Sequence, residues 1–590
     1  MAKKRAFADA LQNHRLGRVG EAERLYRQVL TDDPRHAESL HLLGVLAHQT
    51  RRPALAVEMI SRAIAINANV ASYHSNLASA HYGQGRLAES VVCLRNAIGL
   101  DPHSPEIWYN LGNALREQGR PGEAIGCYRS AIAIRPDYPV AHSNLGSTLH
   151  EQGRLDEALA CFRKALDVSP DNPEIQNNLG ITLKEQWRLD EAVACYRSAT
   201  NLRPNYPEAH NNLGVALKEQ RRLDEALACY RKALELRPDY PEAHNNMGVL
   251  LLEMRRLDDA VACYRSAIDI RPDYPDAHYN LSLALLARGD MVAGWNEHEW
   301  RWKTPQGVRE RRTFEQRQWQ GEAGRGQTLL VHAEQGLGDT LQFCRYAPLA
   351  AERGLDVILE VPKPLVRLLR GLRGTQLVVE DGGKLPAFDF HCPMLSMPLA
   401  LGAATIPSCT PYLYADEAQA AVYQNRLQAM AKQGIRVGLV WAGNPRRHMP
   451  AMAAIDSRRS LAPEMLAPLL DLPGLHFLSL QKDGPKAPAG FPLTDLMDGI
   501  EDFADTAALI VNLDLVISVD TAAAHLAAAL GKPVWLLDRF DSCWRWLAGR
   551  RDSPWYPTLR LYRQPKPGDW KSVLTEVVRD LGVGFGSLTQ

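Results

Sequence analysis

The sequence has little of what marks several common classes of protein. Lysine plus arginine and aspartate plus glutamate each number 68 among its 590 residues, so the formal net charge is zero. Proteins that bind nucleic acids or anionic membranes usually carry a basic excess, and we expect neither partner. No uninterrupted apolar run reaches about 18 residues, so no membrane-spanning helix is predicted. The N-terminal stretch MAKKRAFADALQNHR lacks the apolar segment of a secretory signal, and we therefore expect a cytoplasmic protein.

Patterns typical of metal sites and disulfides are also lacking. The ten cysteines form no CxxC pair and no cluster with histidine. Six of them recur every 34 residues, which indicates one repeat position where a small side chain packs between helices: Cys93, Cys127, Cys161, Cys195, Cys229 and Cys263. The sequence thus predicts no metal ion, no disulfide and no bound cofactor.

The 34-residue period dominates the first half of the chain. It is carried by a glycine on the first helix of each unit and an aromatic residue on the second: Gly112, Gly146, Gly180, Gly214 and Gly248, with Tyr128, Phe162, Tyr196, Tyr230 and Tyr264. With a proline between units, these positions resemble the tetratricopeptide repeat. The resemblance implies about eight full copies over residues 3–274 and an incomplete unit over 275–302. Residues 1–302 are therefore expected to form an all-α superhelix with a concave groove.

An asparagine recurs at one phase of the first helix, at Asn76, Asn110, Asn144, Asn178, Asn212, Asn246 and Asn280. The periodicity places His244, Gly248 and Leu251 on the buried face and Asn246 away from it. The amides are expected either to hold the backbone of a protein acceptor, or to be solvated or cap a neighbour. A similar ladder occurs in the O-GlcNAc transferase superhelix, and this resemblance implies acceptor binding. The histidine column is interpreted as packing rather than metal ligation: His74, His142, His210, His244 and His278.

The second half changes to short β-branched runs that alternate with helical segments, typical of parallel sheets with crossover helices. Residues 303–327 are polar and aperiodic and predict a linker. We expect one α/β half over residues 328–434, with strands at 328–333 and 355–361 and a helix at 340–354. The other half covers 435–590, with strands at 436–443, 476–481, 515–519 and 533–538. Its last helix, 571–581, is expected to cross back to the first half.

Several motifs carry a resemblance to the ADP-heptose-type glycosyltransferase superfamily, above all to bacterial members fused to tetratricopeptide repeats. They are HAEQGLGDTLQFCRYAP, RVGLVWAGNP, FLSLQK, DFADTAALI, LDLVISVDTAAAHLAAALGKPVW and DSPWYP. The resemblance implies a GT-B fold of two Rossmann-like domains and a nucleotide-sugar donor. It also implies inverting transfer without a metal, with which the absence of a DxD motif agrees. With the repeats, it implies a protein O-glycosyltransferase, and flagellin is a known acceptor for proteins of this plan.

Transfer to a hydroxyl requires a base near the acceptor. The resemblance places this carboxylate at Asp339, behind Gly336 and Gly338, whose small size lets the backbone approach the donor. Helix capping by Asp339 is the alternative, and the two roles can coexist. His332 and Glu334 at the same strand end are fallback bases.

The donor is expected at the strand ends of the second half. Free amides and a positive helix end at the DTAAAH motif attract phosphate oxygens. The predicted donor-binding residues are Asp520, Thr521, Ala522 and His525, together with Trp441, Gly443, Asn444, Arg459, Gln481 and Lys482. The loop 444–460 departs from the wording of the family, which leaves Arg446, Arg447 and His448 undecided. Trp544 and Trp546 are expected either to stack on the donor or to fill the core.

Two other functions stay open. One is a heptosyltransferase-like enzyme acting on lipid or oligosaccharide acceptors, in which the repeats would have no evident use. The other is a non-catalytic adaptor with a decayed transferase domain, against which the retention of Asp339, Asp520 and His525 argues. Because the terminal repeats can either pair or act as caps, oligomerisation is also open.

Overall fold

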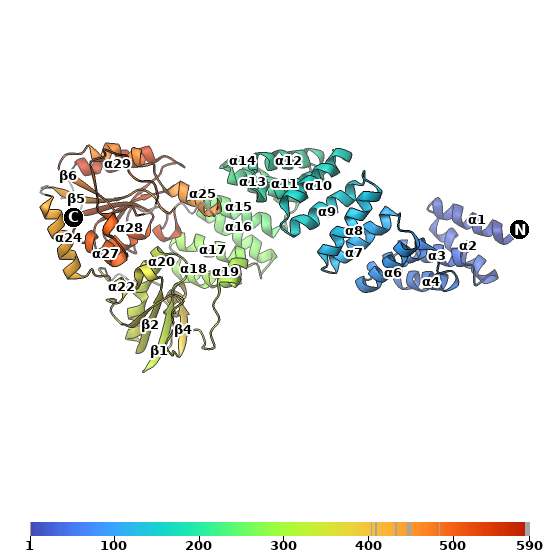
Figure 1. The fold of residues 1–590 in the computed structure, drawn as a ribbon, viewed down its shortest axis with the longest axis horizontal. Coiled ribbons are helices and arrows are strands. Elements are labelled where there is room, and N and C mark those ends of the chain that lie inside the picture. The colour runs from blue at the N-terminus through green and yellow to red at the C-terminus, as the bar shows by residue number, and fades with distance from the viewer. Residues whose placement is uncertain are drawn as a thin grey trace. The chain divides into compact units, whose positions relative to one another are not determined.

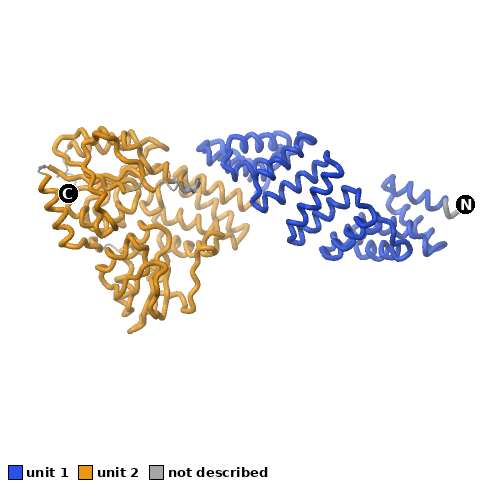
Figure 2. Tube along the Cα trace, viewed as in Figure 1, with its two compact units in different colours: residues 1–238 blue, residues 239–590 orange. Residues whose placement is uncertain are grey.

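The computed structural model describes residues 2–402, 404–407, 410–430, 434–444, 450–482 and 484–583. The chain divides into two compact units, residues 1–238 and 239–590 (Figure 2). Helices α1–α14 belong to the first unit, whereas α15–α18 share the second unit with both sheets.

The first unit is a stack of antiparallel helix pairs in which each helix packs on the next one along the chain (Figure 1). Its helices are α1 (Ala2–Arg15), α2 (Val19–Asp32), α3 (Ala37–Gln49), α4 (Pro53–Ile66), α5 (Ala71–Tyr82), α6 (Leu87–Leu100), α7 (Pro105–Glu117), α8 (Pro121–Ile134), α9 (Pro139–Glu151), α10 (Leu155–Val168), α11 (Pro173–Glu185), α12 (Leu189–Leu202), α13 (Pro207–Glu219) and α14 (Leu223–Leu236). The predicted all-α repeat array is confirmed.

The recurring glycine is explained by the aromatic residue 16 positions later. A Cβ atom on Gly112 would lie 2.6 Å from Cε1 of Tyr128, and the same overlap recurs at Gly180 with Tyr196. Both tyrosine rings are fully buried. Close approach of the paired helices therefore requires glycine at this position.

The histidine column ties each first helix to the loop before it. Nε2 of His74, His142 and His210 lies 2.8, 2.9 and 3.0 Å from a carbonyl oxygen six residues earlier. In the one unit that has tryptophan there, Nε1 of Trp108 donates the same bond over 2.9 Å. This position therefore packs, as interpreted, and it also makes a hydrogen bond to the preceding loop that either histidine or tryptophan can form.

The second unit begins with two more helix pairs, α15 (Pro241–Glu253), α16 (Leu257–Ile270), α17 (Pro275–Arg288) and α18 (Met291–His298). The unit predicted to be incomplete is therefore a full pair, although α18 is short. Helices η1 (Glu299–Lys303) and α19 (Pro305–Glu310) follow, so the predicted linker is partly helical. It is also anchored, since the ring of Trp319 is fully buried and its backbone N–H donates to the His391 carbonyl over 2.8 Å.

The first sheet has four parallel strands in the order β3-β2-β1-β4. They are β1 (Gln327–His332), β2 (Leu355–Val361), β3 (Thr375–Glu380) and β4 (Phe390–Pro393); β3 and β4 were not predicted. The associated helices are α20 (Leu337–Phe343), η2 (Cys344–Tyr346), α21 (Ala347–Glu352), α22 (Lys363–Leu369), η3 (Met394–Ser396) and α23 (Met397–Ala400). The single helix predicted at 340–354 is thus three short ones, and it starts early enough to include Asp339.

The second sheet has six parallel strands in the order β10-β9-β8-β5-β6-β7. They are β5 (Ile435–Val440), β6 (Leu475–Ser479), β7 (Leu493–Asp495), β8 (Leu515–Val519), β9 (Val534–Asp538) and β10 (Leu559–Arg563). This is the strand order of a dinucleotide-binding fold, and the first sheet follows the same order over its four strands. The helices are α24 (Glu417–Ala429), α25 (Pro450–Arg459), η4 (Pro463–Leu466), α26 (Ala467–Leu470), η5 (Met497–Gly499), α27 (Phe503–Ile510), α28 (Ala522–Ala529), η6 (Trp544–Trp546) and α29 (Trp570–Gly582). The predicted α/β class is confirmed.

Helix α29 stays with the second sheet (Figure 1). Its buried residues Trp570, Val573 and Val577 share a hydrophobic cluster with Val437 and Leu439 of β5. The expectation that this helix crosses back to the first half is wrong, because its apolar stripe is already covered by its own sheet.

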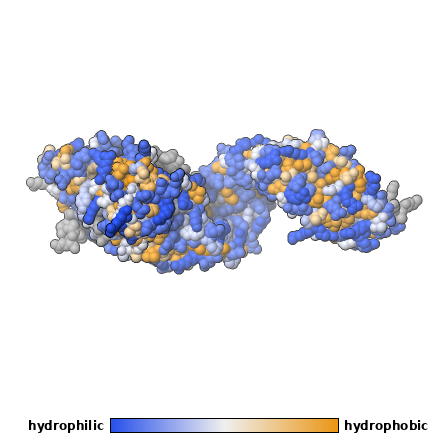
Figure 3. Space-filling model, turned by 90° about the horizontal axis from the view of Figure 1, so that it is seen from below, coloured by the Kyte–Doolittle hydropathy of each residue, from blue (hydrophilic) through white to orange (hydrophobic). Residues whose placement is uncertain are grey.

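Surface hydropathy is mixed over the face shown in Figure 3, where hydrophobic and hydrophilic residues are interspersed. In the part of the chain that the structure describes, no helix is both long and apolar enough to cross a membrane.

Candidate functional site

Each sheet reverses its strand order beside its first strand, and ligands of open parallel sheets bind at such points, beyond the carboxyl ends of the strands. In the second sheet β5 pairs with both β6 and β8. Trp441, Gly443 and Asn444 follow β5, whereas Asp520 and Thr521 follow β8. The topology thus brings together two groups of predicted donor-binding residues that are far apart in sequence.

Asp339 lies in the first turn of α20, just beyond β1 of the first sheet. Its Oδ2 atom accepts a hydrogen bond from the Gly336 N–H over 3.0 Å, which caps the helix. Its Oδ1 atom forms an ion pair with Nη2 of Arg545. The carboxylate therefore caps its helix and, at the same time, is directed at the second sheet.

Helix α20 packs directly on α28 of the second sheet. A Cβ atom on Gly338 would lie 3.0 Å from Cδ2 of His525 and 3.7 Å from Cα of Ala522. Glycine is thus needed here for the approach of the two helices. The contact places Asp339 and the DTAAAH motif in one site.

His525 is buried and firmly held in that site. Its Nδ1 atom lies 3.0 Å from the Tyr556 hydroxyl, its ring stacks on Trp546 at a centroid distance of 5.0 Å, and Nε2 is 3.8 Å from Oδ1 of Asp520. Burial lowers the pKa of His525 to about 4. The imidazole is therefore neutral near pH 7, with its orientation fixed by Tyr556.

Arg545 was missed by the sequence analysis. Besides Asp339, its Nη2 atom lies 3.4 Å from Oε1 of Gln335, and its guanidinium stacks 4.5 Å from the Trp544 ring. Burial is the largest single effect and lowers the pKa of Arg545, but Asp339, Cys543 and Asp520 together raise it more, so the net shift is upward. The only signal in the sequence is a single charged residue between two tryptophans, in SCWRWL.

The tryptophans expected to stack on the donor or to fill the core do the latter. Trp546 is fully buried, and Trp544 packs edge-on against Trp295 at 5.5 Å. Trp441 is also buried, and its Nε1 donates to the Pro485 carbonyl over 2.8 Å. The indole of Trp441 thus belongs to the core rather than to a surface that a ligand could contact.

Arg459 links the ends of β5 and β8. Its Nη1 atom donates to the Asp520 carbonyl over 3.2 Å, and its Nε atom donates to Asp456 over 2.9 Å. The Gly443 N–H donates to Ser460 Oγ over 3.1 Å. Arg446, Arg447 and His448 lie outside the described residues.

Gln481 and Lys482 hold backbone groups in the same region. Oε1 of Gln481 accepts from the N–H groups of Trp441 and Ala442 over 3.1 and 3.0 Å. Nζ of Lys482 donates to the Ile500 carbonyl over 2.7 Å. Both side chains thus position the loops that border the site.

The two fallback bases are held in buried networks. Arg301 donates two hydrogen bonds of 2.9 Å to Glu334, and the Leu395 N–H donates a third of 2.9 Å. Burial lowers the pKa of His332 to about 3, and its Nε2 is 3.3 Å from Nδ1 of His391. These contacts favour a structural role for both residues.

No group of three or more His, Cys, Asp or Glu side chains is arranged to hold a metal ion within the described ranges. The expectation of a metal-independent reaction remains a prediction.

The asparagine ladder is engaged between repeats. In the first unit Nδ2 of Asn212 donates to Oδ1 of Asn177 over 3.0 Å, and Nδ2 of Asn144 donates to Asn113 over 2.9 Å. In the second unit Asn280 donates to Asn245 over 2.9 Å. The alternative in which the amides cap a neighbour is thus realised, while the ladder side chains stay only half-buried.

A second asparagine column, one residue before the ladder, was missed. Asn177, Asn211 and Asn245 are buried, at 5, 5 and 6% exposure. His244, predicted on the buried face, is only half-buried, whereas Ala243 and Asn245 on either side of it are buried. The recurring Asn-Asn pairs were the available signal.

Comparisons with known proteins match the repeats and part of the second sheet region separately. Models described as TPR repeat or tetratricopeptide repeat match residues 14–71, 79–119, 112–153, 146–186, 188–221, 207–240, 229–262 and 253–289. The N-terminal half is a tetratricopeptide-repeat superhelix. The model described as glycosyltransferase family 9 (heptosyltransferase) matches residues 498–537, which include Asp520 and His525. The C-terminal half thus carries a glycosyltransferase-like segment.

One curated relative is Protein FlbA of Caulobacter vibrioides, 27% identical over 331 residues, which are 50% of this chain and 53% of that protein. The chain thus spans about half the length of this relative. The crystal structure of MamA is 27% identical with a TM-score of 0.27, and it covers 27% of this chain and 94% of its own. YrrB, described as a TPR protein with an unusual peptide-binding site, is 26% identical with a TM-score of 0.28, and covers 31% of this chain and 95% of its own.

Proposed function

We propose that this protein is a glycosyltransferase of the GT-B type, which moves a sugar from a nucleotide-sugar donor to a Ser or Thr hydroxyl of a protein held by the repeats. The observation that carries the proposal is the contact of α20 with α28. It sets a carboxylate, Asp339, beside the helix start at Asp520–His525, within the segment that the glycosyltransferase family 9 model matches. A base from one sheet and an anion site from the other are the two parts that glycosyl transfer needs.

The proposed reaction is a single displacement with inversion at the anomeric carbon. The acceptor oxygen attacks this carbon, the bond from carbon to the donor phosphate oxygen breaks, and the hydroxyl proton passes to Asp339. The bond electrons leave with the nucleotide. No metal is needed if protein cations and helix amides neutralise the phosphate.

The structure offers such groups at the start of α28. Thr521 is the N-cap, and within the described residues no side-chain hydrogen bond caps this helix start, so its first amides stay available to phosphate oxygens. Arg545 pairs with Asp339 and its side chain is only 12% exposed, which strengthens its attraction for an anion. In the proposed cycle Arg545 leaves Asp339 and pairs with the donor phosphate instead, so the Asp339 carboxylate is free to act as the base.

The acceptor is proposed to lie along the asparagine ladder. Each half-buried amide has two N–H donors and an oxygen acceptor, so a bond to the preceding repeat leaves capacity for an extended backbone. The bonds between repeats also fix the amide orientation, which lowers the entropy lost on binding.

The direct test is the intact mass of an acceptor co-expressed with the wild type or with Asp339→Asn. Flagellin is the first acceptor to try. The proposal expects a sugar-sized increment with the wild type, and a decrease of about 10²–10⁴-fold in rate for Asp339→Asn, as for loss of a general base. Asp356→Asn, at an exposed carboxylate of β2, is the matched control and should not reduce the increment. Equal increments with and without Asp339 would refute its role as the base.

The same experiment separates the other functions. An acceptor that binds but gains no mass, even with the cell's full set of nucleotide sugars present, favours the adaptor. A mass gain on an oligosaccharide or lipid, with none on protein, favours the heptosyltransferase-like enzyme.

Acceptor binding is tested by replacing two ladder residues, Asn144→Ala with Asn212→Ala. Asn201→Ala with Asn205→Ala, at exposed positions outside the ladder, is the matched control. Loss of about 1 kcal/mol for each amide predicts roughly thirtyfold weaker binding for the first variant alone. Equal affinities would show that the ladder serves only the contacts between repeats.

A further inference from the structure

A pocket outside the predicted donor site is lined by arginines from three separate segments. It has a volume of about 160 Å³, and Arg255, Arg550, Arg551, Arg563 and Glu576 contribute to its wall. Arg255 comes from the turn between α15 and α16, Arg550 and Arg551 from the loop after η6, and Arg563 from the last position of β10. A water molecule needs only ~10–15 Å³, so the pocket has room for a larger group.

Positive charge exceeds negative charge in this wall. Its one carboxylate, Glu576, already pairs with Nη1 of Arg551 over 2.6 Å. Arg550 pairs with Asp552, which is 69% exposed and does not line the pocket. An exposed pair of this kind contributes little stabilisation and is easily exchanged.

Arg563 is the deepest of these cations, with a side chain that is 11% exposed. Its Nη2 atom donates to the Trp546 carbonyl over 2.6 Å, and its Nε atom lies 3.0 Å from Oδ2 of Asp538. Its Nη1 atom is buried and has no hydrogen-bond partner among the described residues. A buried guanidinium with an unpaired N–H is poorly solvated, and the charge of an anion in the pocket would offset part of this cost.

The neighbouring arginines also repel this one. The pKa of Arg563 is lowered by burial first and then by the positive charges of Arg255 and Arg550, although Asp538 opposes these effects. An anion between the three guanidinium groups would replace repulsion with attraction.

We propose that Arg255, Arg550 and Arg563 form a binding pocket for a phosphate group. Arginine suits this ligand because its planar N–H groups match two phosphate oxygens at once. The pocket lies at the carboxyl edge of the second sheet, where β10 is two strands from β8. At ~4.8 Å for each strand, the phosphate sits about 10 Å across the sheet from the end of β8. The inference does not depend on the proposed transfer reaction.

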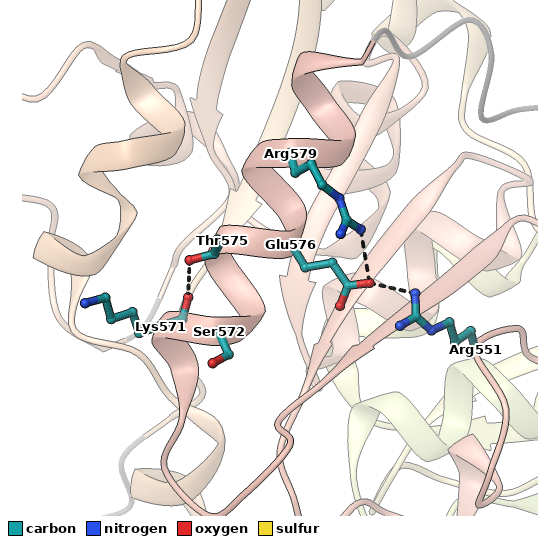
Figure 4. Close-up of a pocket in the computed structure, with 6 residues that line it drawn as sticks. All are labelled: Arg551, Lys571, Ser572, Thr575, Glu576 and Arg579. Carbon is teal, nitrogen blue, oxygen red and sulfur yellow. Dashed lines mark hydrogen bonds and ion pairs between the residues drawn. The ribbon is translucent and has the colours of Figure 1, made fainter.

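A wider basic groove of about 500 Å³ adjoins the pocket, and the two share Arg551 and Glu576. Figure 4 shows Glu576 between Arg551 and Arg579, with Lys571 and Ser572 one turn back along α29. A molecule that places one phosphate in the pocket thus has a basic, hydroxyl-lined path for its remainder.

The test is calorimetric titration of the full chain with inorganic phosphate and with pyrophosphate. The wild type should bind, and the double variant Arg255→Gln with Arg550→Gln should bind at least about tenfold more weakly, since each charged hydrogen bond contributes ~1.5–3 kcal/mol. Arg370→Gln with Arg373→Gln, two exposed arginines near α22, removes the same charge elsewhere and should leave the affinity unchanged. Arg563 is left intact because it also supports the loop carrying Trp546.

Equal affinity in the wild type and the Arg255/Arg550 variant, or no binding by the wild type at millimolar phosphate, overturns the proposal. The affinity of the Arg255/Arg550 variant is compared only if its thermal unfolding midpoint matches that of the Arg370/Arg373 control. Arg255→Lys, which keeps the positive charge, should restore part of the affinity for phosphate. Repeating the titration with saturating ADP or UDP distinguishes two sources of the bound phosphate group. Displacement of phosphate means that the pocket takes the phosphates of the donor, whereas simultaneous binding means a second phosphate-bearing molecule.

Discussion

Asp339 and Arg545 are 206 positions apart in the sequence and form an ion pair at the junction of the two sheets. The carboxylate comes from the first turn of α20, and the guanidinium comes from η6, which follows the last-but-one strand of the second sheet. Their side chains are 17 and 12% exposed. Because neither charge is well solvated, each is stabilised chiefly by the other, and a ligand that binds one must compensate the other.

This pairing predicts strong coupling between the two residues. Arg545→Gln leaves a poorly solvated carboxylate without its partner and should lower the free energy of unfolding by ~3–5 kcal/mol. In the double variant with Asp339→Asn, no unpaired charge remains, and we expect ~1–3 kcal/mol of that loss to be recovered. Denaturant unfolding of the four proteins measures the coupling. Additive losses would mean that the two charges are independently solvated.

The contact of α20 with α28 predicts that Gly338→Ala impairs the site. The new methyl group would meet a His525 ring that Tyr556 and Trp546 hold in place, so the helices must separate. Separation of the two helices would misplace Asp339 relative to the donor site and should lower the rate of transfer by about tenfold to a hundredfold. Gly371→Ala is the matched control, because a Cβ atom there has its nearest neighbour at 3.8 Å. If Gly338→Ala glycosylates the acceptor as fast as the wild type, the contact of α20 with α28 is not needed by the site.

The turns of the repeats predict a stabilising substitution. Trp187 has φ of 59° at the position where other repeats have Gly119 and Gly153 at 76° and 71°. Since the left-handed conformation costs a residue with a Cβ atom ~1–2 kcal/mol, Trp187→Gly should raise the free energy of unfolding by up to about 1 kcal/mol after the entropy of glycine is subtracted. Gly153→Ala, the reverse change, should lower it. Thermal unfolding of both variants gives the comparison, and a loss of stability in Trp187→Gly contradicts the reasoning.

Buried histidines predict that acid destabilises the second unit. Burial lowers the pKa of His332 to about 3 and of His525 to about 4, and it also lowers that of His298. Below pH ~6.5 these histidines are protonated in the unfolded chain but stay neutral in the native protein. The free energy of unfolding therefore falls by up to ~1.4 kcal/mol per pH unit for each histidine. Asp538 works against this, because burial raises its pKa to about 6 and the native carboxyl then holds a proton. Because three histidines are affected and only one aspartate opposes them, the free energy of unfolding should fall as the pH is lowered from 6.5 toward 5.

The measurement is the thermal midpoint between pH 7.5 and 5. His332→Asn should flatten its pH dependence by the share of one group, whereas His103→Asn, at an exposed position, should leave the slope unchanged. A midpoint that does not change over this range would show that the native histidines take up protons freely.

The sequence predicted the repeat array well because its contacts are local. Gly112 and Tyr128 lie in one helix pair, so their spacing of 16 residues is visible as a period. Strands β2 and β8 were predicted with the observed bounds, since both are short runs dominated by β-branched and other apolar residues. Strands β4 and β7, with four and three residues, have too few positions to show any pattern. The second asparagine column was missed because burial of a polar side chain depends on a partner in the next repeat.

By itself, the sequence determined the helix pairs, the parallel sheets and the residues at the strand ends, because each of these follows from a period or a run within a short stretch of chain. The tertiary structure alone decided that Asp339 is paired with Arg545, that Trp544 and Trp546 fill the core, and that the arginines at 255, 550 and 563 face one another. These relationships join segments up to about 300 residues apart. No local pattern encodes them, since they arise only when strand order and helix packing bring the segments together.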